Sequence, residues 1–520
     1  MCNRTTLLCL IFTIPFTSIV NAELTSVEIG GKIEIYGLYY RQWIEPSDQV
    51  RIPSCALFGR SIGPEGTYSA YRSGEGSTGT SYVEQRTRLH TKATMTDNIS
   101  VFFEVDSIDT WGEDFRSQQY LTGKDNRADS SDDIELFQAY IQAKDFGIND
   151  LTFTVGRQAI DLGSGWLVGS DPGPNVFTGL SFDAIRLQYE KESWMLDVFY
   201  GKLFESMSSF NHDDIDFWST YFTWKNIWEG TNIDFYYFLL RDNTNSEVTR
   251  DDFILEAIEG VLGRDNSDTT YIHTIGLRFY GSHEDWDYEM ETAYQWGEGS
   301  AFGNLFVPIG GIYGDDDISW SLPAGHFEVG YTLSKIKWSP RVYLGGCYYD
   351  ADDNRDVSFM DWFLNLDASS ASPSFNRLFS AYREENFIDI SGMTNFWQVY
   401  SGVSVNPTEK VEVSFELSYL QTISSFDSPY SFSLGSYEFY PLGYLSFFTQ
   451  ENPKDLGWQT LLTLSYAYNE DLNFETGWSH FFVGDGIVKG AFLDNYGTSF
   501  ISTMNDNDSD FFYIASTIEF

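Results

Sequence analysis

Hydrophobic and polar residues alternate with a period of two along most of this chain. In 411–419, five apolar residues at odd positions alternate with Glu412, Ser414, Glu416 and Ser418 at even positions. In 286–296, the even positions are mostly aromatic and the odd positions are mostly polar. This period is typical of strands that have one apolar and one polar face. The pattern therefore predicts a β-protein rather than a helical one.

Eighteen such segments can be identified, and the lengths of their connections follow a rule. The segments are 27–43, 82–95, 98–107, 133–144, 150–158, 181–191, 193–202, 215–226, 230–241, 270–280, 284–297, 324–334, 337–350, 393–405, 409–421, 456–468, 471–484 and 510–520. Eight short turns alternate with nine long loops rich in Gly, Ser and Asp. A soluble sandwich has no reason to segregate loop length by side, whereas membrane barrels do so. The fold class predicted is all-β: one transmembrane antiparallel β-barrel of about 18 strands, with long extracellular loops and short periplasmic turns.

Both ends of the chain fit export to an outer membrane. Residues 1–22 have the three zones of a signal peptide, namely a basic start, an apolar stretch and Val-Asn-Ala before a cleavage site. We predict one barrel domain over 23–520. The last strand alternates up to Phe520, and a terminal aromatic carboxylate is typical of the segment read by the barrel assembly machinery. The alternative interpretation is an edge strand of a soluble sheet.

Composition changes the picture in two ways. Aromatic residues reach 18% although mean hydropathy is −0.27, as expected when aromatic rims surround a polar interior. Acidic residues outnumber basic ones by 76 to 31, giving a formal charge of −45. Nucleic acid is excluded as a partner because phosphate binding needs clustered Lys and Arg. After signal removal only Cys55 and Cys347 remain, and they either pair in the oxidising periplasm or stay unpaired.

Charged residues on the polar phase of the strands should face the lumen, because charge facing lipid is costly. Two interpretations stay open for the basic members: contact with a solute, or pairing with neighbouring acids to stiffen the wall. An acidic lumen disfavours entry of anions. The pore-lining candidates are Lys32, Glu34, Arg86, Arg88, Glu104, Asp106, Arg186, Arg278, Glu289, Glu291, Arg341, Glu412 and Glu416.

Several stretches resemble the alginate-export family of outer-membrane porins. They are Leu151–Gln158, which ends in Gly-Arg-Gln, then Phe182–Leu187, Arg341–Gly346, Phe375–Phe379 and Leu472–Asp485. The resemblance implies an eighteen-stranded monomeric barrel. It also implies export of a polyanion through an arginine-rich channel, from which this acidic chain departs.

The predicted function is a passive porin for small hydrophilic solutes, with a lumen that favours cations. Two alternatives stay open: a polysaccharide exporter, and a surface barrel plugged by a long loop such as 44–81 or 351–392. The loop 351–392, which carries Phe and Trp, is the better candidate for a plug. Outer-membrane lipid and the barrel assembly machinery are the predicted partners.

Catalytic and metal chemistry receive little support. The sequence contains no Gly-x-Ser-x-Gly elbow and no His-Glu-x-x-His motif, so no enzymatic activity is predicted. No cofactor is expected, with Ca²⁺ in acidic loops as the one alternative. Its candidate ligands are Asp350, Asp352, Asp506 and Asp508, whose oxygen atoms suit Ca²⁺, although solvated acids that keep the loops polar are the simpler explanation.

Overall fold

The structure is a computed structural model. It describes residues 24–41, 80–96, 98–112, 134–170, 180–205, 214–243, 269–299, 318–351, 375–382, 384, 394–424, 453–488 and 508–520, together with the short strands given below. Within these residues, no helix is long and apolar enough to cross a membrane.

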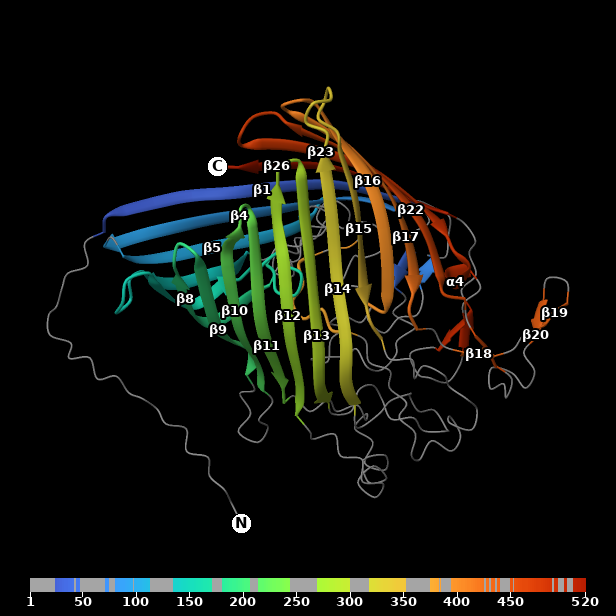
Figure 1. The fold of residues 1–520 in the computed structure, drawn as a ribbon, viewed down its shortest axis with the longest axis horizontal. Helices are drawn as coiled ribbons and strands as arrows, with labels where there is room; N and C mark the ends of the chain where they lie inside the picture. Colours follow the sequence, from blue (N-terminus) through green and yellow to red (C-terminus); the bar gives the residue numbers. More distant parts are fainter. Residues whose placement is uncertain are drawn as a thin grey trace, which may run out of the picture.

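Eighteen long strands form one sheet that closes on itself (Figure 1). Each strand pairs antiparallel with the next along the chain, and the last strand, β26, pairs with β1. The eighteen-stranded antiparallel barrel is therefore confirmed. The strands are β1 (Ser26–Arg41), β4 (Thr80–Thr96), β5 (Ile99–Thr110), β6 (Glu135–Ala143), β7 (Leu151–Ala159), β8 (Ser181–Glu190), β9 (Trp194–Glu205), β10 (Asp214–Trp228), β11 (Thr231–Asp242), β12 (Thr270–His283), β13 (Trp286–Gly299), β14 (Ile318–Thr332), β15 (Arg341–Tyr349), β16 (Phe396–Thr408), β17 (Val411–Thr422), β22 (Asp455–Ala467), β23 (Leu472–Val483) and β26 (Ser509–Glu519).

Short elements lie between the long strands. The paired strands are β2 (Ile44–Pro46) with β3 (Tyr71–Ser73), β18 (Asp427–Pro429) with β21 (Thr449–Glu451), β19 (Phe432–Leu434) with β20 (Tyr437–Phe439), and β24 (Ala491–Leu493) with β25 (Phe500–Ser502). One helical turn, α4, spans Asp485–Val488.

The two largest errors in the predicted strand starts both lie near a proline. Strand β14 begins at Ile318, six residues before the predicted start at 324. This strand contains Pro323, and proline is unusual within a strand because it has no amide hydrogen to donate. In the barrel it stands opposite Tyr294, and its carbonyl accepts a hydrogen bond from the amide of Asp350. Strand β15 begins at Arg341, directly after Pro340, rather than at 337.

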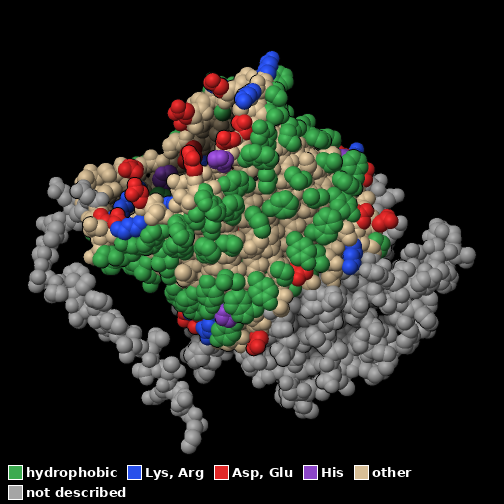
Figure 2. Space-filling view, viewed as in Figure 1, with side chains coloured by type: hydrophobic (Ala, Val, Ile, Leu, Met, Phe, Trp, Pro, Cys, Tyr) green, Lys and Arg blue, Asp and Glu red, His purple; other side chains and the backbone are tan. Residues whose placement is uncertain are grey.

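The two faces of the sheet follow the predicted alternation. On β12, for example, Ile275 and Leu277 are about half exposed on the outer face, whereas Thr274 and Arg278 are buried on the inner face. The wall seen in Figure 2 is covered mainly by hydrophobic and uncharged side chains, with Lys, Arg, Asp and Glu gathered at its margins. An apolar outer band around a polar interior is the arrangement that lipid requires of a barrel.

Aromatic side chains mark the end of the barrel where short turns connect the strands. Exposed Trp224, Trp228, Trp286 and Trp338 lie in or beside these turns. Indole rings are favoured at the membrane–water boundary because they are apolar with one polar N–H group. The position of these residues therefore marks the edge of the lipid-facing band.

The C-terminal strand closes the wall as predicted. Its outward residues include Phe512 and Ile514, and Phe511 and Tyr513 point inward and are buried. Phe520 and Gly31 exchange backbone hydrogen bonds of 3.0 and 2.9 Å, and the Phe520 ring is more than half exposed. Recognition of Phe520 during assembly stays a prediction.

Two segments from long loops pack against the inner face of the wall. Segment 160–170 follows β7, and segment 375–382 belongs to the connection between β15 and β16. They run parallel at Val168 and Phe379, and the Phe379 amide donates to the Leu167 carbonyl at 2.9 Å. The Phe379 ring meets Phe182 and Phe217 of the wall edge-on, at centroid distances of 5.2 and 4.9 Å. The predicted inward folding of loop 351–392 thus holds for its described part, whereas segment 160–170 was not predicted to fold inward.

Candidate functional site in the barrel lumen

The predicted pore-lining residues lie on the inner phase of their strands and form separate groups. Glu34, Arg86, Glu104, Asp106, Arg278 and Glu291 are buried, Lys32, Arg88, Arg186, Glu289, Arg341 and Glu416 are partly buried, and Glu412 is exposed near a short turn. The structure brings together Lys32 with Glu34, the four candidates on β4 and β5 (Arg86, Arg88, Glu104 and Asp106), and Arg278 with Glu289 and Glu291. Their contact with a solute stays a prediction.

On β4 and β5, arginine and carboxylate side chains pair across neighbouring strands. Arg86 donates two hydrogen bonds to one Asp106 oxygen, at 2.6 and 2.9 Å, with the guanidinium almost fully buried. Arg88 lies between Glu104 and Asp106, at 3.7 and 3.5 Å. Two arginines thus face two carboxylates, which corresponds to the wall-stiffening interpretation.

Arg186 of β8 has a partner that sequence reasoning missed. Asp197 of β9 is buried and accepts hydrogen bonds from the Arg186 guanidinium at 2.5 and 3.0 Å. The signal was available, because Asp197 is the one charged residue in the apolar run 194–200. Lipid-facing burial of an acid is expensive, so a lone Asp in such a run should face the lumen.

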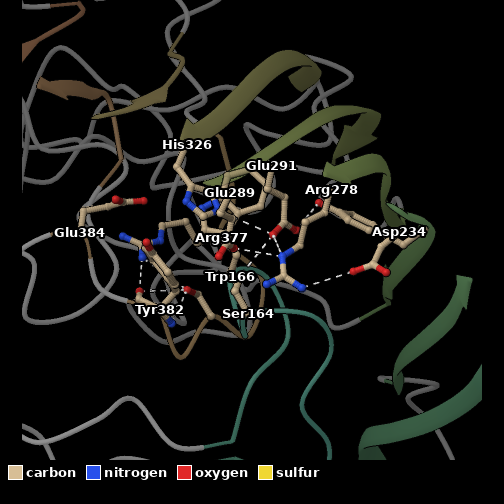
Figure 3. A network of polar contacts seen from close by, with 12 residues as sticks. Ser164, Trp166, Asp234, Arg278, Glu289, Glu291, His326, Arg377, Tyr382 and Glu384 are labelled. Atoms are coloured by element: carbon tan, nitrogen blue, oxygen red, sulfur yellow. Dashed lines mark hydrogen bonds and ion pairs between the residues drawn. The ribbon is translucent and has the colours of Figure 1, made fainter. Parts of the chain in front are cut away.

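The densest network lies on the wall formed by β11 to β14 (Figure 3). The Arg278 guanidinium donates to Glu289 at 3.0 Å and to Asp234 at 3.3 Å, and lies 3.6 Å from Glu291. It also stacks over the Tyr280 ring at 3.8 Å. One arginine is therefore shared among three carboxylates, which leaves negative charge in excess.

Both inward segments contact this network. The Ser164 hydroxyl donates to Glu291 at 3.2 Å, and the buried Trp166 indole donates to the Tyr349 hydroxyl at 2.5 Å. Trp166 also packs against the His326 ring, with centroids 5.1 Å apart. These contacts attach segment 160–170 to the wall.

Segment 375–382 is attached in the same region. Arg377 stacks over the Tyr349 ring at 4.8 Å and donates to the Tyr382 carbonyl. Burial, followed by the negative charge of Glu384, raises the pKa of the Tyr382 phenol well above its ordinary value, so this phenol stays neutral. The loops therefore bring aromatic rings and one arginine to a wall that carries several carboxylates.

A repeated arrangement of Tyr, Gly and Glu lines the inner wall of β14 to β17. Tyr343 stands opposite Gly402, which stands opposite Glu416, and the Tyr343 hydroxyl donates to Glu416 at 3.0 Å. Tyr400 reaches Glu328 in the same way across Gly345, at 2.9 Å.

Glycine is required between the two partners. A Cβ atom on Gly402 or Gly345 would lie 2.3 Å from the tyrosine ring that covers it. The ring can lie flat across the middle strand only where that strand has no side chain. The register therefore places a phenol donor on each glutamate.

Tyrosine donors serve other inner carboxylates too. Hydroxyl groups of Tyr221, Tyr236, Tyr349 and Tyr513 donate to Asp234, Glu291, Glu384 and Glu475, respectively. A phenol supplies a hydrogen bond without a positive charge, so it stabilises the carboxylate and leaves its charge in place.

The remaining sequence candidates lie elsewhere. Asp350 accepts a hydrogen bond from the Tyr348 hydroxyl, and Asp508 accepts one from the amide of Val483. Asp352, Asp506 and Cys55 lie outside the described residues, so calcium binding and the Cys55–Cys347 bond stay predictions. Cys347 is buried, and its thiol lies 3.7 Å from the side-chain oxygen of Gln398.

A closed barrel of eighteen antiparallel strands with an apolar outer band, an aromatic rim and a charged interior defines an outer-membrane barrel of the channel or exporter class. A profile for alginate export matches residues 69–492. This range is most of the chain, and the chain belongs to the alginate export family. The family named from sequence motifs is thereby confirmed. No curated protein matches the sequence.

The solved structures that this chain matches are distant in sequence. OccK11 (OpdR) of Pseudomonas aeruginosa has 7% identity and a TM-score of 0.46, with 95% of this chain and 96% of that chain covered. OccAB1 of Acinetobacter baumannii has 10% identity and a TM-score of 0.48, with 94% and 96% covered. Similarities this distant give no information about the solute.

Proposed function

We propose that this protein is a passive outer-membrane channel whose lumen favours small hydrophilic cations. The observation that carries the proposal is the way inner carboxylates are partnered. On the inner face of β23 and β26, for example, the Tyr513 phenol donates to Glu475 at 2.6 Å, so this side chain is held in place by a group that adds no positive charge. A water-filled lumen of this kind attracts cations and repels anions.

The arginines do not reverse this balance. Arg278 contacts three carboxylates, and Arg341 contacts Asp287 and Glu328. A guanidinium that already lies against two or three carboxylates presents little positive charge to a passing solute. Export of a polyanion, suggested by the family, would need positive charge at the constriction.

The inward segments 160–170 and 375–382 give the channel its selectivity region. Because they contact the wall of β10 to β16, a solute in the lumen passes close to the network of carboxylates and arginines on that wall. A surface barrel closed by its loops would share this geometry but would carry no current. Conductance therefore separates the two functions.

The test is reversal potential across a planar bilayer with a KCl gradient. The wild-type channel should conduct and should prefer K⁺ over Cl⁻. Glu475→Gln should lower the permeability ratio, because a unit charge acts on a monovalent ion 10 Å away in water with about 0.4 kcal/mol. Removing the charge raises the free energy of K⁺ in the lumen and lowers that of Cl⁻ by up to this amount. The ratio of K⁺ to Cl⁻ permeability should therefore fall roughly two- to fourfold.

Asp183→Asn is the matched control, because it removes one negative charge from the outer face. Asp183 is half exposed there and accepts hydrogen bonds from Arg157 at 2.9 and 3.0 Å. Its neutralisation should leave the ratio unchanged. Absence of current would contradict the channel, and a preference for Cl⁻ would contradict the cation-favouring lumen.

A further inference from the structure

Three potential metal ligands meet on the inner wall, beside segment 160–170. Ligand atoms of Glu289, Glu291 and His326 all lie within 4.8 Å of one another. Figure 3 shows the three side chains converging between Arg278 and the inward segments. The cluster thus lies where a solute in the lumen meets the wall.

The strand register explains why these side chains converge. Glu289 and Glu291 are two residues apart on β13, so they point to the same face. His326 of β14 stands directly opposite Glu291. Directly opposed and same-face neighbours in a sheet lie about 5–7 Å apart at Cβ, which is within reach of a shared ion.

The histidine has an unused ring nitrogen. His326 is 5% exposed, and its Nε2 atom is buried with no hydrogen-bond partner in the part of the chain that the structure describes. It points toward Glu291, whose Oε2 atom lies 3.6 Å away. A buried polar atom without a partner costs about 1–3 kcal/mol, and a metal ion bound there would remove that cost.

We infer that Glu289, Glu291 and His326 form a binding site for a divalent first-row transition-metal ion such as Zn²⁺. One imidazole nitrogen and two carboxylates suit these borderline ions better than Ca²⁺ or Mg²⁺, which prefer oxygen alone. Donor atoms around such an ion lie roughly 3–3.5 Å apart, given metal–ligand distances of about 2.1 Å. The nitrogen and the Glu291 oxygen already approach this spacing, and Glu289 is exposed enough to rotate into place.

The Arg278 side chain occupies part of this space and would have to move when the ion binds. Its Nε atom donates to Glu289, but its Nη1 atom already lies 3.3 Å from Asp234. The second Asp234 oxygen, Oδ1, is buried without a hydrogen-bond partner among the described residues. Arg278 can therefore move onto Asp234 and pair with both oxygens as the ion takes the two glutamates.

This inference rests on the proposed function in that the ion reaches the site through the channel, but its test does not use current. Purified protein in detergent is treated with EDTA, dialysed, and titrated with ZnCl₂ by isothermal titration calorimetry. One Zn²⁺ should bind per barrel. His326→Gln and Glu289→Gln should each weaken binding at least about tenfold, since losing even a group behind a ligand costs 10–100-fold.

His273→Gln is the control histidine variant. His273 lies on the outer phase of β12 and pairs with the Tyr237 hydroxyl at 2.8 Å. Its loss should leave zinc affinity unchanged. Heat-modifiable migration on gels shows whether each variant is folded. If His326→Gln does not fold, Glu289→Gln alone tests the site.

The site would be overturned if the wild-type protein did not bind Zn²⁺. It would also be overturned if folded His326→Gln and Glu289→Gln bound Zn²⁺ with the affinity of the wild-type protein. Either result leaves the potassium selectivity measured without zinc intact. A channel that lacks cation preference yet binds one Zn²⁺ would instead overturn the proposed function and retain the site.

Discussion

Replacing Trp166 by alanine should release segment 160–170 from the barrel wall. Trp166 is 1% exposed, packs against Phe375 and His326, and donates a hydrogen bond to Tyr349. A tryptophan buries about 150–250 Å², worth roughly 4–6 kcal/mol at 25 cal/mol per Å². Measured losses for a buried tryptophan truncated to alanine are about 3–5 kcal/mol. We therefore expect the substitution to cost about 4 kcal/mol.

This cost should appear as local opening rather than as unfolding of the barrel. The barrel wall is held by the ladders of eighteen strands, whereas segment 160–170 is held by side-chain contacts and by three backbone hydrogen bonds to segment 375–382. At 1.4 kcal/mol per tenfold, 4 kcal/mol raises the released population by roughly three orders of magnitude. Single-channel recording should then show larger or more frequent open levels, and proteinase K should cut the segment faster.

Trp166→Phe is the graded control, because it keeps an aromatic ring against Phe375 but loses the bond to Tyr349. A single hydrogen bond contributes about 1 kcal/mol, so its effect should stay below about tenfold. Trp338→Ala, in an exposed short turn, should change neither current nor cleavage of the segment. If Trp166→Ala leaves both measurements at wild-type values, the segment is not held by this side chain, and the energetic reasoning is wrong.

Three further predictions follow from single contacts. Asp106→Asn removes the carboxylate that pairs with the buried Arg86 guanidinium. The midpoint temperature of heat modification should therefore fall, by the equivalent of about 3–5 kcal/mol, and an unchanged midpoint would contradict this. Gly402→Ala should displace the Tyr343 ring and lower the free energy of unfolding in urea by about 1–3 kcal/mol; an unchanged value would contradict this. Deleting Phe520 should lower the yield of membrane-inserted protein, and normal yield would refute an assembly role; the ion preference of the channel that does form should not change.

The strands were predictable because their signal is local. An alternation such as that of 411–419 reports which face meets lipid, whatever the strand's neighbours are. The same local signal placed Phe520 at the end of a strand that must close the wall. It failed where proline interrupts an otherwise regular pattern, as at Pro323, because opposing strands decide whether a missing amide hydrogen matters.

The site was predictable only in its parts. Which carboxylate meets Arg186, and which tyrosine crosses Gly402, depend on the register between the paired strands. The alternation of polar and apolar residues does not determine this register. The inward fold of segment 160–170 depends on contacts of Trp166 with β15, more than 180 residues away. Sequence reasoning thus found the charges but not their partners.

Partnering, rather than the number of basic residues, determines what an inner wall offers to a solute. Arg341 pairs with Asp287 and Glu328, so its positive charge is neutralised within the wall. Glu475 is held by the Tyr513 phenol, which adds no positive charge beside it. A count of charged residues gives both side chains equal weight. The electrostatic potential in the lumen depends instead on which charges are neutralised by their neighbours. Two members of one family with the same strands can therefore favour ions of opposite sign, if one places tyrosines where the other places arginines.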